Sequence, residues 1–494
     1  MSLTSIAYGM FLLLAGGIYW SVPRPNWRLW IVLIASLAFY AFWQVQYVPL
    51  LLAIAFINFG LGRLMGYRES GESAASESKN AAFTKLDWNW VLLILGIILN
   101  VLLLLGFKYL PFLFSSLQPL LDLPIPQERV NWIADNPIAP LGLSFFSFES
   151  IAYLIDVYRG APAAQGFLPF AAYKLFFPKL ISGPITPYHQ FASQWASLRF
   201  PNAQLVVEAL WSIAFGAAKK VLVADRLGIF VTLCFDNLVR AGSGDLWLAT
   251  LAYGLQLYLD FSGYVDIVRG SAILFGLHLP ANFDYPYFST SIADFWRRWH
   301  MSLGDWLRNY LYFPLGGSRR GLASTCLNLL IVMAIAGIWH GAAWGFIVWG
   351  LLHGMALVVH RITEAISGPN SLWHSFPGVI LAWALTQAMV FTAWIFFRLP
   401  SLPDSGWVLQ HLWGYTADVQ FAQKVYLDSM GLDRLQFALL LGLLFLGMFC
   451  LFVLHRLIEL QLNWPLKLLL VPICLYTVWH LAPQGGLPYI YFDF

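Results

Sequence analysis

Two histidines in strongly apolar surroundings are the residues of this sequence best suited to do chemistry. His300 lies in DFWRRWHMSLGDWLRNYLYFPLGGSRRG, residues 294–321, and His340 lies in GIWHGAAWG, residues 337–345. A neutral imidazole can take up or release a proton near physiological pH, so it suits general acid–base catalysis. A packed histidine with satisfied hydrogen bonds explains each of the two stretches about as well when it is taken alone.

The segment around His300 also concentrates positive charge. Ser291 and Asp294 form a capping-box-like pattern, which predicts the start of a helix, and apolar residues recur at helical spacing as far as Pro314. We therefore expect an amphipathic helix of about 18 residues at the membrane surface, with His300 on its apolar side. Simple membrane anchoring accounts for this pattern too. The arginines of the segment are Arg297, Arg298, Arg308, Arg319 and Arg320.

His340 lies inside an apolar run, residues 325–361, that is too long for one membrane span. A continuous helix of that length would measure about 55 Å, whereas the hydrocarbon core is about 30 Å thick. GAAWG, residues 341–345, predicts the break, which places His340 at a helix end. Helix ends that line a cavity within the membrane are typical substrate sites. His353, in the sequence LHG, is more simply explained by packing.

Membrane-spanning helices must position these histidines. The chain has 494 residues, of which 59% are hydrophobic and 11% charged, with a mean hydropathy of +0.68. Soluble domains carry about 25% charged residues, so we predict an all-α polytopic membrane protein with about eleven transmembrane helices. The apolar runs are too long for barrel strands. They lie near residues 4–22, 29–43, 48–62, 89–107, 203–223, 245–259, 325–340, 345–360, 377–397, 439–455 and 464–481.

Composition gives little indication of soluble partners. The formal net charge is +3, and we expect no nucleic-acid partner. The first apolar stretch lacks a basic leader, so we interpret it as a first helix and not as a signal peptide. The cysteines show no CxxC spacing, and we expect them to be small buried hydrophobic residues, with neither a disulfide framework nor a metal site. They are Cys234, Cys326, Cys450 and Cys474.

Basic residues predict the orientation of the chain in the membrane. Cytoplasmic loops are enriched in lysine and arginine, and Arg63, Arg68, Lys79 and Lys85 therefore place the loop 63–88 in the cytoplasm. The amino terminus should then be extracytoplasmic. By the same rule the loop 118–139 should lie outside, and the arginine-rich segment 291–321 should lie inside as a cytoplasmic amphipathic or re-entrant element.

Acidic residues within apolar segments call for partners. We expect Glu149 and Asp156 to pair with Arg159, and Asp260 and Asp266 to pair with Arg269, in structural ion pairs. Carboxylates inside a membrane protein could equally relay protons.

Motifs along most of the chain resemble those of the membrane-bound O-acyltransferase (MBOAT) family, in particular its bacterial alginate O-acetyltransferase branch. The resemblance rests on LGLSFFSFESIAYLIDVYRG (141–160), FFPKLISGPI (176–185), YLDFSGYVDI (258–267), PYFSTSIADFWRRWHMSLGDWLRNYLYFPLGG (286–317), GIWHGAAWGFIVWGLLHG (337–354), WIFFR (394–398) and the terminal YIYFDF.

This resemblance implies a single membrane-embedded domain over residues 1–494, with carboxyl-terminal helices over 362–494, and a ring of helices around a thin core that contains a tunnel. It implies that His340 is the catalytic histidine and that His300 also takes part. The donor implied is cytoplasmic acetyl-CoA, with no bound cofactor. The arginines of the 291–321 segment, together with Trp339 and Trp344, become candidate donor-binding residues, although lipid headgroups are an equally simple partner for the arginines.

The implied activity is O-acetylation of an exported polysaccharide by a multi-pass protein of the bacterial cytoplasmic (inner) membrane. Family members generally work with a separate extracytoplasmic acetyltransferase or esterase-like partner. His340 would act as general base or as a transient acyl carrier. Two alternatives stay open: a transporter or flippase with an intramembrane His, Asp and Glu proton relay, and, within the family, D-alanyl transfer to teichoic acid.

Overall fold

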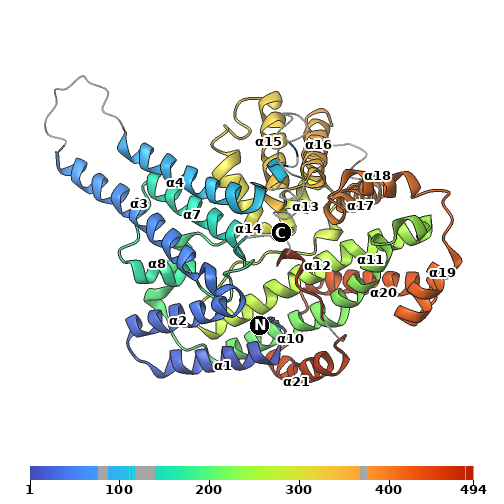
Figure 1. Cartoon of the computed structure of the whole chain (residues 1–494), viewed down its shortest axis with the longest axis horizontal. Helices are drawn as coiled ribbons and strands as arrows, with labels where there is room; N and C mark the ends of the chain where they lie inside the picture. Colours follow the sequence, from blue (N-terminus) through green and yellow to red (C-terminus); the bar gives the residue numbers. More distant parts are fainter. Residues whose placement is uncertain are drawn as a thin grey trace. The chain divides into compact units, whose positions relative to one another are not determined.

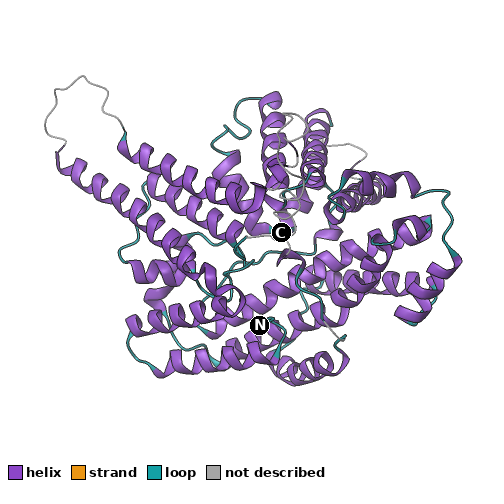
Figure 2. Ribbon diagram, in the orientation of Figure 1, coloured by secondary structure: helices purple, strands orange, loops and turns teal. Residues whose placement is uncertain are grey.

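The computed structural model describes residues 1–75, 87–110, 112–114, 116, 139–367, 373, 375–483 and 486–492. These residues form helices and connecting loops, and no strand occurs among them (Figure 2). They divide into two compact units. Unit 1 comprises Met1–Val206 and Val268–Pro280, and unit 2 comprises Val207–Ile267 and Ala281–Phe494.

Unit 1 contains the amino-terminal helices (Figure 1). Side chains cap two of them, because Ser5 accepts a hydrogen bond from the Tyr8 amide and Asp87 accepts from the amides of Asn89 and Trp90. The elements are α1 (Ile6–Ser21), α2 (Pro25–Gln44), η1 (Val45–Tyr47), α3 (Val48–Ala75), α4 (Trp88–Leu104), η2 (Leu105–Tyr109), α7 (Leu143–Tyr158), α8 (Phe167–Lys174), α9 (Tyr188–Ala192) and η3 (Ser193–Ser197).

The core of unit 1 is aromatic. Phe177 packs edge-on against Tyr8, Phe11 and Phe275, with ring centroids 5.2–6.3 Å apart. The Tyr8 hydroxyl donates a hydrogen bond of 2.9 Å to Ser271 Oγ. Aromatic rings contribute large buried areas, and a buried hydroxyl requires a hydrogen-bond partner of this kind.

Unit 2 contains both candidate histidines. It includes most of α10 (Ala203–Ala218) and of α12 (Ser243–Leu274). Its other elements are η4 (Lys219–Ala224), α11 (Asp225–Phe235), η5 (Leu238–Arg240), η6 (Pro286–Phe288), α13 (Ile292–Arg298), α14 (Met301–Leu307), η7 (Arg308–Tyr312), α15 (Leu322–His340), α16 (Trp344–Ile366), α17 (Phe376–Arg398), α18 (Leu402–His411), α19 (Val419–Ala422), η9 (Gln423–Met430), α20 (Arg434–Phe452), η10 (Val453–Leu457), α21 (Trp464–Leu481) and η11 (Ile490–Phe492).

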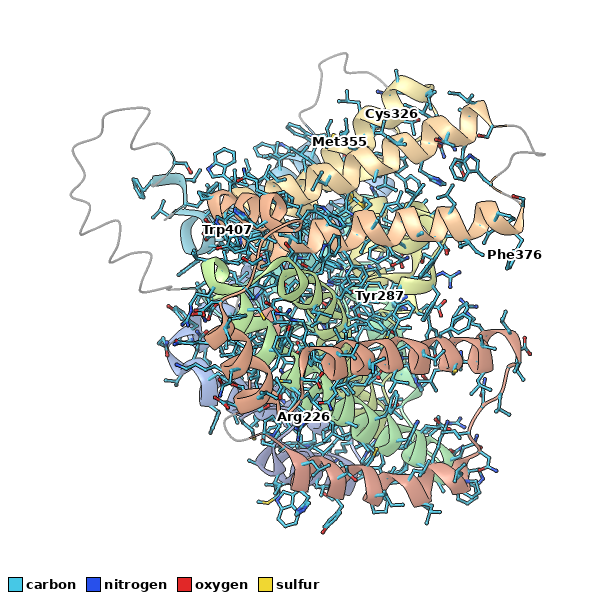
Figure 3. The ribbon with its side chains drawn as sticks, turned by 90° about the vertical axis from the view of Figure 1, so that its right-hand side faces the viewer. Arg226, Tyr287, Cys326, Met355, Phe376 and Trp407 are labelled. Carbon is cyan, nitrogen blue, oxygen red and sulfur yellow. The ribbon has the colours of Figure 1, made fainter. Side chains whose placement is uncertain are left out.

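Helices α15 and α16 form a tight hairpin. α15 ends at His340 and α16 begins at Trp344, which confirms the predicted break. A Cβ atom on Gly337 would collide with the Phe346 carbonyl oxygen, and one on Gly350 would collide with the Met333 carbonyl oxygen. Glycine at these positions lets the two helix backbones approach closely. Figure 3 marks the hairpin and its neighbour by Cys326 on α15, Met355 on α16 and Phe376 on α17.

Seven helical segments among the described residues are long and apolar enough to cross a membrane. The predicted count of about eleven is not confirmed, although each of the eleven apolar runs overlaps a helix. The runs at 29–43 and 48–62 fall within one segment, Pro25–Gly66. The seven segments do not include α1, α10 or α12.

Some loop predictions changed at their boundaries. α3 continues to Ala75, so part of the predicted 63–88 loop is helical, and residues 76–86 lie outside the described residues. Almost all of the predicted outer loop 118–139 also lies outside them. The membrane orientation stays a prediction. Of the four cysteines, Cys450 on α20 is exposed, so its expected burial was wrong.

Candidate active site

His300 lies at a sharp turn and not within a helix. α13 ends at Arg298, α14 begins at Met301, and His300 between them has φ +44° and ψ 54°. The predicted continuous helix of about 18 residues was therefore wrong, although its start was right, since Ser291 accepts a hydrogen bond from the Asp294 amide. The left-handed conformation is uncommon for residues other than glycine and is found often at functional sites. The side chain is fully buried, as its place on the apolar side predicted.

Asn282 holds this turn in place. Its backbone carbonyl accepts a hydrogen bond of 2.9 Å from the Met301 amide. Its side-chain Oδ1 atom accepts from the Ser302 amide at 3.0 Å and from the Ser302 hydroxyl at 2.9 Å. The same Oδ1 atom lies 3.2 Å from His300 Nδ1. A residue 18 positions earlier in the sequence therefore fixes the backbone on the carboxyl-terminal side of the turn.

This geometry determines the tautomer of His300. The Ser302 amide can only donate, so the Asn282 atom it contacts must be the acceptor oxygen. His300 Nδ1 must then carry the hydrogen, which leaves the lone pair on Nε2. Burial lowers the pKa of His300 to about 3, so the imidazole is neutral at physiological pH. His300 thus presents Nε2 as a hydrogen-bond acceptor and not as a cation.

His340 has a different environment, made of aromatic rings. It is the last residue of α15 and is 3% exposed. Its ring centroid lies 4.9 Å from those of Trp339 and Trp349 and 5.1 Å from that of Phe397, with interplanar angles of 71–86°. These edge-to-face contacts surround an imidazole at the turn between two helices. The arrangement keeps bulk water away from the ring.

The two histidines belong to one cluster. The Trp339 ring lies 6.2 Å from that of His300 and 4.9 Å from that of His340, so it connects the two imidazoles. On the other side of His340, the Trp349 ring lies 4.9 Å from that of His353. His353 is fully buried and its Nδ1 accepts a hydrogen bond of 3.3 Å from Trp296 Nε1. The sequence reading of His353 as a packing residue agrees with this environment.

The candidate donor-binding residues fall into two groups. Arg298 pairs with Asp294 at 3.0 Å, Arg308 pairs with Asp305 at 2.6 Å, and Arg297 donates to the Ala293 carbonyl at 3.3 Å. These three arginines are thus held by their own segment. Two more arginines of the set, Arg319 and Arg320, follow η7 and have no side-chain partner among the described residues. Of the two tryptophans, Trp339 is buried and Trp344 is exposed.

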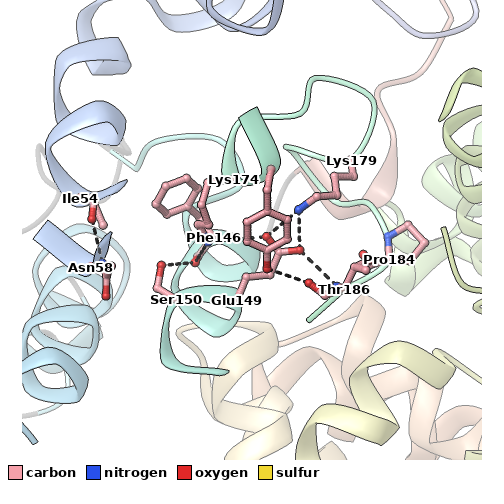
Figure 4. Close-up of polar contacts among 10 residues, drawn as sticks. Ile54, Asn58, Phe146, Glu149, Ser150, Lys174, Lys179, Pro184 and Thr186 are labelled. Atoms are coloured by element: carbon pink, nitrogen blue, oxygen red, sulfur yellow. Dashed lines mark hydrogen bonds and ion pairs between the residues drawn. The ribbon is translucent and has the colours of Figure 1, made fainter. Parts of the chain in front are cut away.

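The buried acids have lysine partners that the sequence reading missed. In unit 1, Glu149 lies 2.7 Å from Lys179 and 3.6 Å from Lys174, and all three are buried (Figure 4). Burial lowers the pKa of Lys174 to about 7, and its ammonium donates to the Phe146 carbonyl at 2.7 Å. The predicted Arg159 partner for Glu149 was wrong. Lys179 lies in FFPKLISGPI, where a single lysine in an apolar run was the available signal.

The same correction applies in unit 2. Asp260 pairs with Lys220 at 2.6 Å and Asp266 pairs with Lys219 at 2.5 Å, so the predicted Arg269 partner was wrong for both. Lys220 also donates to the Pro488 carbonyl at 2.9 Å, which ties the end of the described chain to η4. Charges buried inside a membrane protein are stable when paired in this way. The pairing of Asp156 with Arg159 stays a prediction.

The chain was compared with known proteins. A sequence model of the MBOAT, membrane-bound O-acyltransferase family matches residues 100–399, a range that contains both candidate histidines. The chain is 37% identical over 398 residues to the probable alginate O-acetylase AlgI of Pseudomonas syringae pv. tomato, covering 80% of this chain and 72% of that protein.

Two further relatives carry other names. The chain is 36% identical over 414 residues to the peptidoglycan O-acetyltransferase of Helicobacter pylori, covering 78% of this chain and 74% of that protein. It is 26% identical over 289 residues to the teichoic acid D-alanyltransferase of Bacillus subtilis, covering 55% of this chain and 72% of that protein. The chain therefore belongs to the membrane-bound O-acyltransferase family and is an O-acyltransferase.

Proposed function

We propose that this O-acyltransferase moves an acetyl group from cytoplasmic acetyl-CoA across the membrane, for O-acetylation of an exported polysaccharide. The observation that carries the proposal is His340, a buried imidazole enclosed by aromatic rings at the end of α15. The relatives named for O-acetyl transfer match at 36–37% identity, against 26% for the one named for D-alanyl transfer. This difference favours acetyl over D-alanyl as the transferred group.

The reaction exchanges a thioester for an ester. His340 takes the proton from the acceptor hydroxyl, the oxygen attacks the thioester carbonyl, and the bond from that carbonyl to sulfur breaks. The protonated imidazole then returns the proton to the leaving thiolate. Hydrolysis competes with this transfer, so the exclusion of water by Trp339, Trp349 and Phe397 serves the chemistry directly. If His340 instead carries the acetyl group, its nitrogen attacks the thioester carbonyl, the bond from that carbonyl to sulfur breaks, and the thiolate leaves with the imidazole proton. The acceptor hydroxyl then attacks the acylated imidazole, the bond from carbonyl to nitrogen breaks, and the hydroxyl proton returns to the imidazole.

His300 supports this reaction as a neutral hydrogen-bond acceptor. Its Nε2 lone pair can accept a hydrogen bond from a hydroxyl or an amide of the donor and so orient it. Arg297, Arg298, Arg308, Arg319 and Arg320, with Trp339 and Trp344, are the candidates for contacts with the donor, and lipid headgroups compete for the arginines. The acceptor would be reached directly or through an extracytoplasmic acetyltransferase or esterase-like partner at the cytoplasmic (inner) membrane of a bacterium.

The transporter alternative depends on a proton relay of intramembrane acids. Glu149, Asp260 and Asp266 are held in ion pairs with lysines, which suits a structural role better than a relay. No specific observation therefore favours the transporter over the acyltransferase.

The test is acetylation of surface polysaccharide after cells are fed labelled acetate. We compare wild type, His340→Ala and a strain without the protein, and we check by immunoblot of membranes that the variant is present. Loss of label in both deficient strains supports the proposal, and the labelled polymer identifies the acceptor. Wild-type labelling by His340→Ala would remove His340 from the chemistry. A parallel feeding with labelled D-alanine that labels the cell surface in place of acetate would replace acetyl by D-alanyl as the transferred group.

A further inference from the structure

A large cavity lies in unit 2 at the opposite end of α15 from His340. Its volume is about 1050 Å³, and its lining comes from the start of α15, the second half of α16 and the first half of α17. Thr325, which lines it, is about 20 Å from His340 along the helix axis. Sites for small molecules usually measure about 300–1,000 Å³. This cavity is at the upper end of that range, so it has room for part of a larger amphiphile. The proposed acetyl transfer gives it no role.

The wall of the cavity between α16 and α17 is apolar. Ala356 and Val359 line it from α16, and Ala382, Leu385 and Met389 line it from α17. Val359 and Leu385 are 63% and 54% exposed, so the wall is open at the helix surface. In a chain of this family such apolar surface contacts the hydrocarbon of the bilayer.

At this end residues of both α16 and α17 line the cavity. Near the opposite end they are in contact, where the Gly345 amide donates a hydrogen bond of 2.9 Å to the Pro400 carbonyl and His353 packs on Trp394 at 6.1 Å. The opening between α16 and α17 is therefore a gap between helices that can admit a hydrocarbon chain from the side.

One rim of the cavity is polar, and two exposed arginines flank it without being part of the lining. Ser318, Gly321 and Thr325 line it, and Arg319 and Arg320 lie between the first two of these residues. Neither arginine has a side-chain partner among the described residues, unlike Arg298 and Arg308 nearby, which are ion-paired.

The charged residues of the lining itself lie on α16 and nearly cancel one another. There Glu364 pairs with Arg361 at 3.2 Å and contacts His360 at 3.5 Å. The unpaired positive charge next to the cavity therefore comes from Arg319 and Arg320, which flank its polar rim in sequence.

We propose that this cavity binds one anionic phospholipid. Its phosphate lies at Arg319 and Arg320, and one acyl chain lies along the apolar wall between α16 and α17. Basic pockets between transmembrane helices are suited to anionic headgroups, because the charge and the apolar wall match the two parts of such a lipid. A coenzyme A molecule fits less well, since its adenine and several phosphates would meet a mainly apolar wall with two free cations. This assigns Arg319 and Arg320 to a lipid and not to the donor.

The test measures lipid binding to the purified, delipidated full chain by native mass spectrometry. Phosphatidylglycerol and phosphatidylcholine with identical acyl chains are titrated in parallel. We expect one phosphatidylglycerol to be retained, at least tenfold more tightly than phosphatidylcholine. Arg319→Gln combined with Arg320→Gln should remove this preference while leaving weak binding of both lipids. Lys424→Gln, an exposed charge away from the cavity lining, is the charge control and should behave as wild type.

A second pair of variants tests the apolar wall. Ala382→Trp fills the cavity and should abolish retention of the lipid, whereas Leu381→Trp places the same bulk on an exposed neighbouring position outside the lining. Size-exclusion profiles and circular dichroism establish that each variant is folded. If Ala382→Trp does not fold, Ala356→Phe replaces it.

Three results would overturn the proposal: equal retention of the two lipids, retention by Ala382→Trp equal to that of Leu381→Trp, or displacement of bound phosphatidylglycerol by coenzyme A or by inorganic phosphate. The coenzyme A result would assign the cavity to the donor. Binding by His340→Ala should equal that of wild type, so failure of the proposed acetyl transfer would leave this result unaffected.

Discussion

His300 and His340 are both buried imidazoles, but they are held by different means. His300 is fixed by hydrogen bonds at a left-handed turn, with Asn282 setting its tautomer. His340 lies at a helix end and packs against three aromatic rings. A hydrogen-bonded clamp specifies which nitrogen carries the proton, whereas an aromatic enclosure specifies the position of the ring. The comparison therefore predicts that substitutions at the two sites fail in different ways.

The largest effect should come from His340. His340→Ala and His340→Gln should each lower acetyl transfer by about 10²–10⁴-fold, because neither side chain can act as a general base. The measurement is the rate of acetyl loss from labelled acetyl-CoA in membranes that contain equal amounts of each protein. If His340→Gln keeps a tenth or more of the wild-type rate, the ring serves only packing.

His300 allows a sharper substitution, because asparagine can mimic one edge of its ring. His300→Asn keeps a donor near the Nδ1 position for Asn282 and tolerates the left-handed backbone, whereas His300→Ala keeps neither advantage. We expect both variants to lose activity, by about 10²-fold or more, while only His300→Ala also loses thermal stability. Activity and melting temperature are measured on the same preparations. Near-normal activity in His300→Asn would limit His300 to a structural role.

Trp349 tests the aromatic enclosure. It is fully buried and packs on both His340 and His353 at 4.9 Å. Trp349→Phe keeps an aromatic edge but leaves space beside the imidazole, so we expect kcat to fall by about tenfold and the hydrolysis of acetyl-CoA without acceptor to rise. Trp413→Phe, at a 75% exposed position, is the matched control. Equal hydrolysis in the two variants would contradict a water-excluding role.

The last effect concerns stability and not activity, and it is a dependence on pH. The pKa of His300 is about 3 in the folded chain, below its ordinary value of 6.5. Between these values the unfolded chain binds a proton that the folded chain does not, so stability falls as pH decreases through this window, by up to about 1.4 kcal/mol per pH unit. Melting temperatures from pH 7 to pH 4.5 should therefore decline less steeply for His300→Asn than for wild type. Parallel declines would contradict this assignment.

Local signals in the sequence predicted part of this arrangement. The glycines near His340 indicated the helix break, and Ser291 indicated the start of α13, because caps and breaks depend on neighbouring residues. The turn at His300 was not predictable from periodicity, since its clamp is Asn282, in a loop without a pattern.

Ion-pair partners were missed for the same reason. Glu149 has an arginine ten positions away, but the fold brings it to Lys179, on a different segment. Hydropathy also located the helices without determining how many of them cross the membrane, because α12 carries acidic residues within an apolar run.

The glycine contacts between α15 and α16 have a consequence for biosynthesis. Gly337 and Gly350 allow two consecutive helices to pack as a hairpin before any later segment is required. His340 and Trp349 are both within this hairpin. Their ring contact can therefore form as soon as the two helices have been synthesised and inserted. Phe397, from α17, arrives afterwards and closes the third side of the aromatic enclosure. The reactive imidazole thus acquires its final environment in the order in which the ribosome delivers the chain.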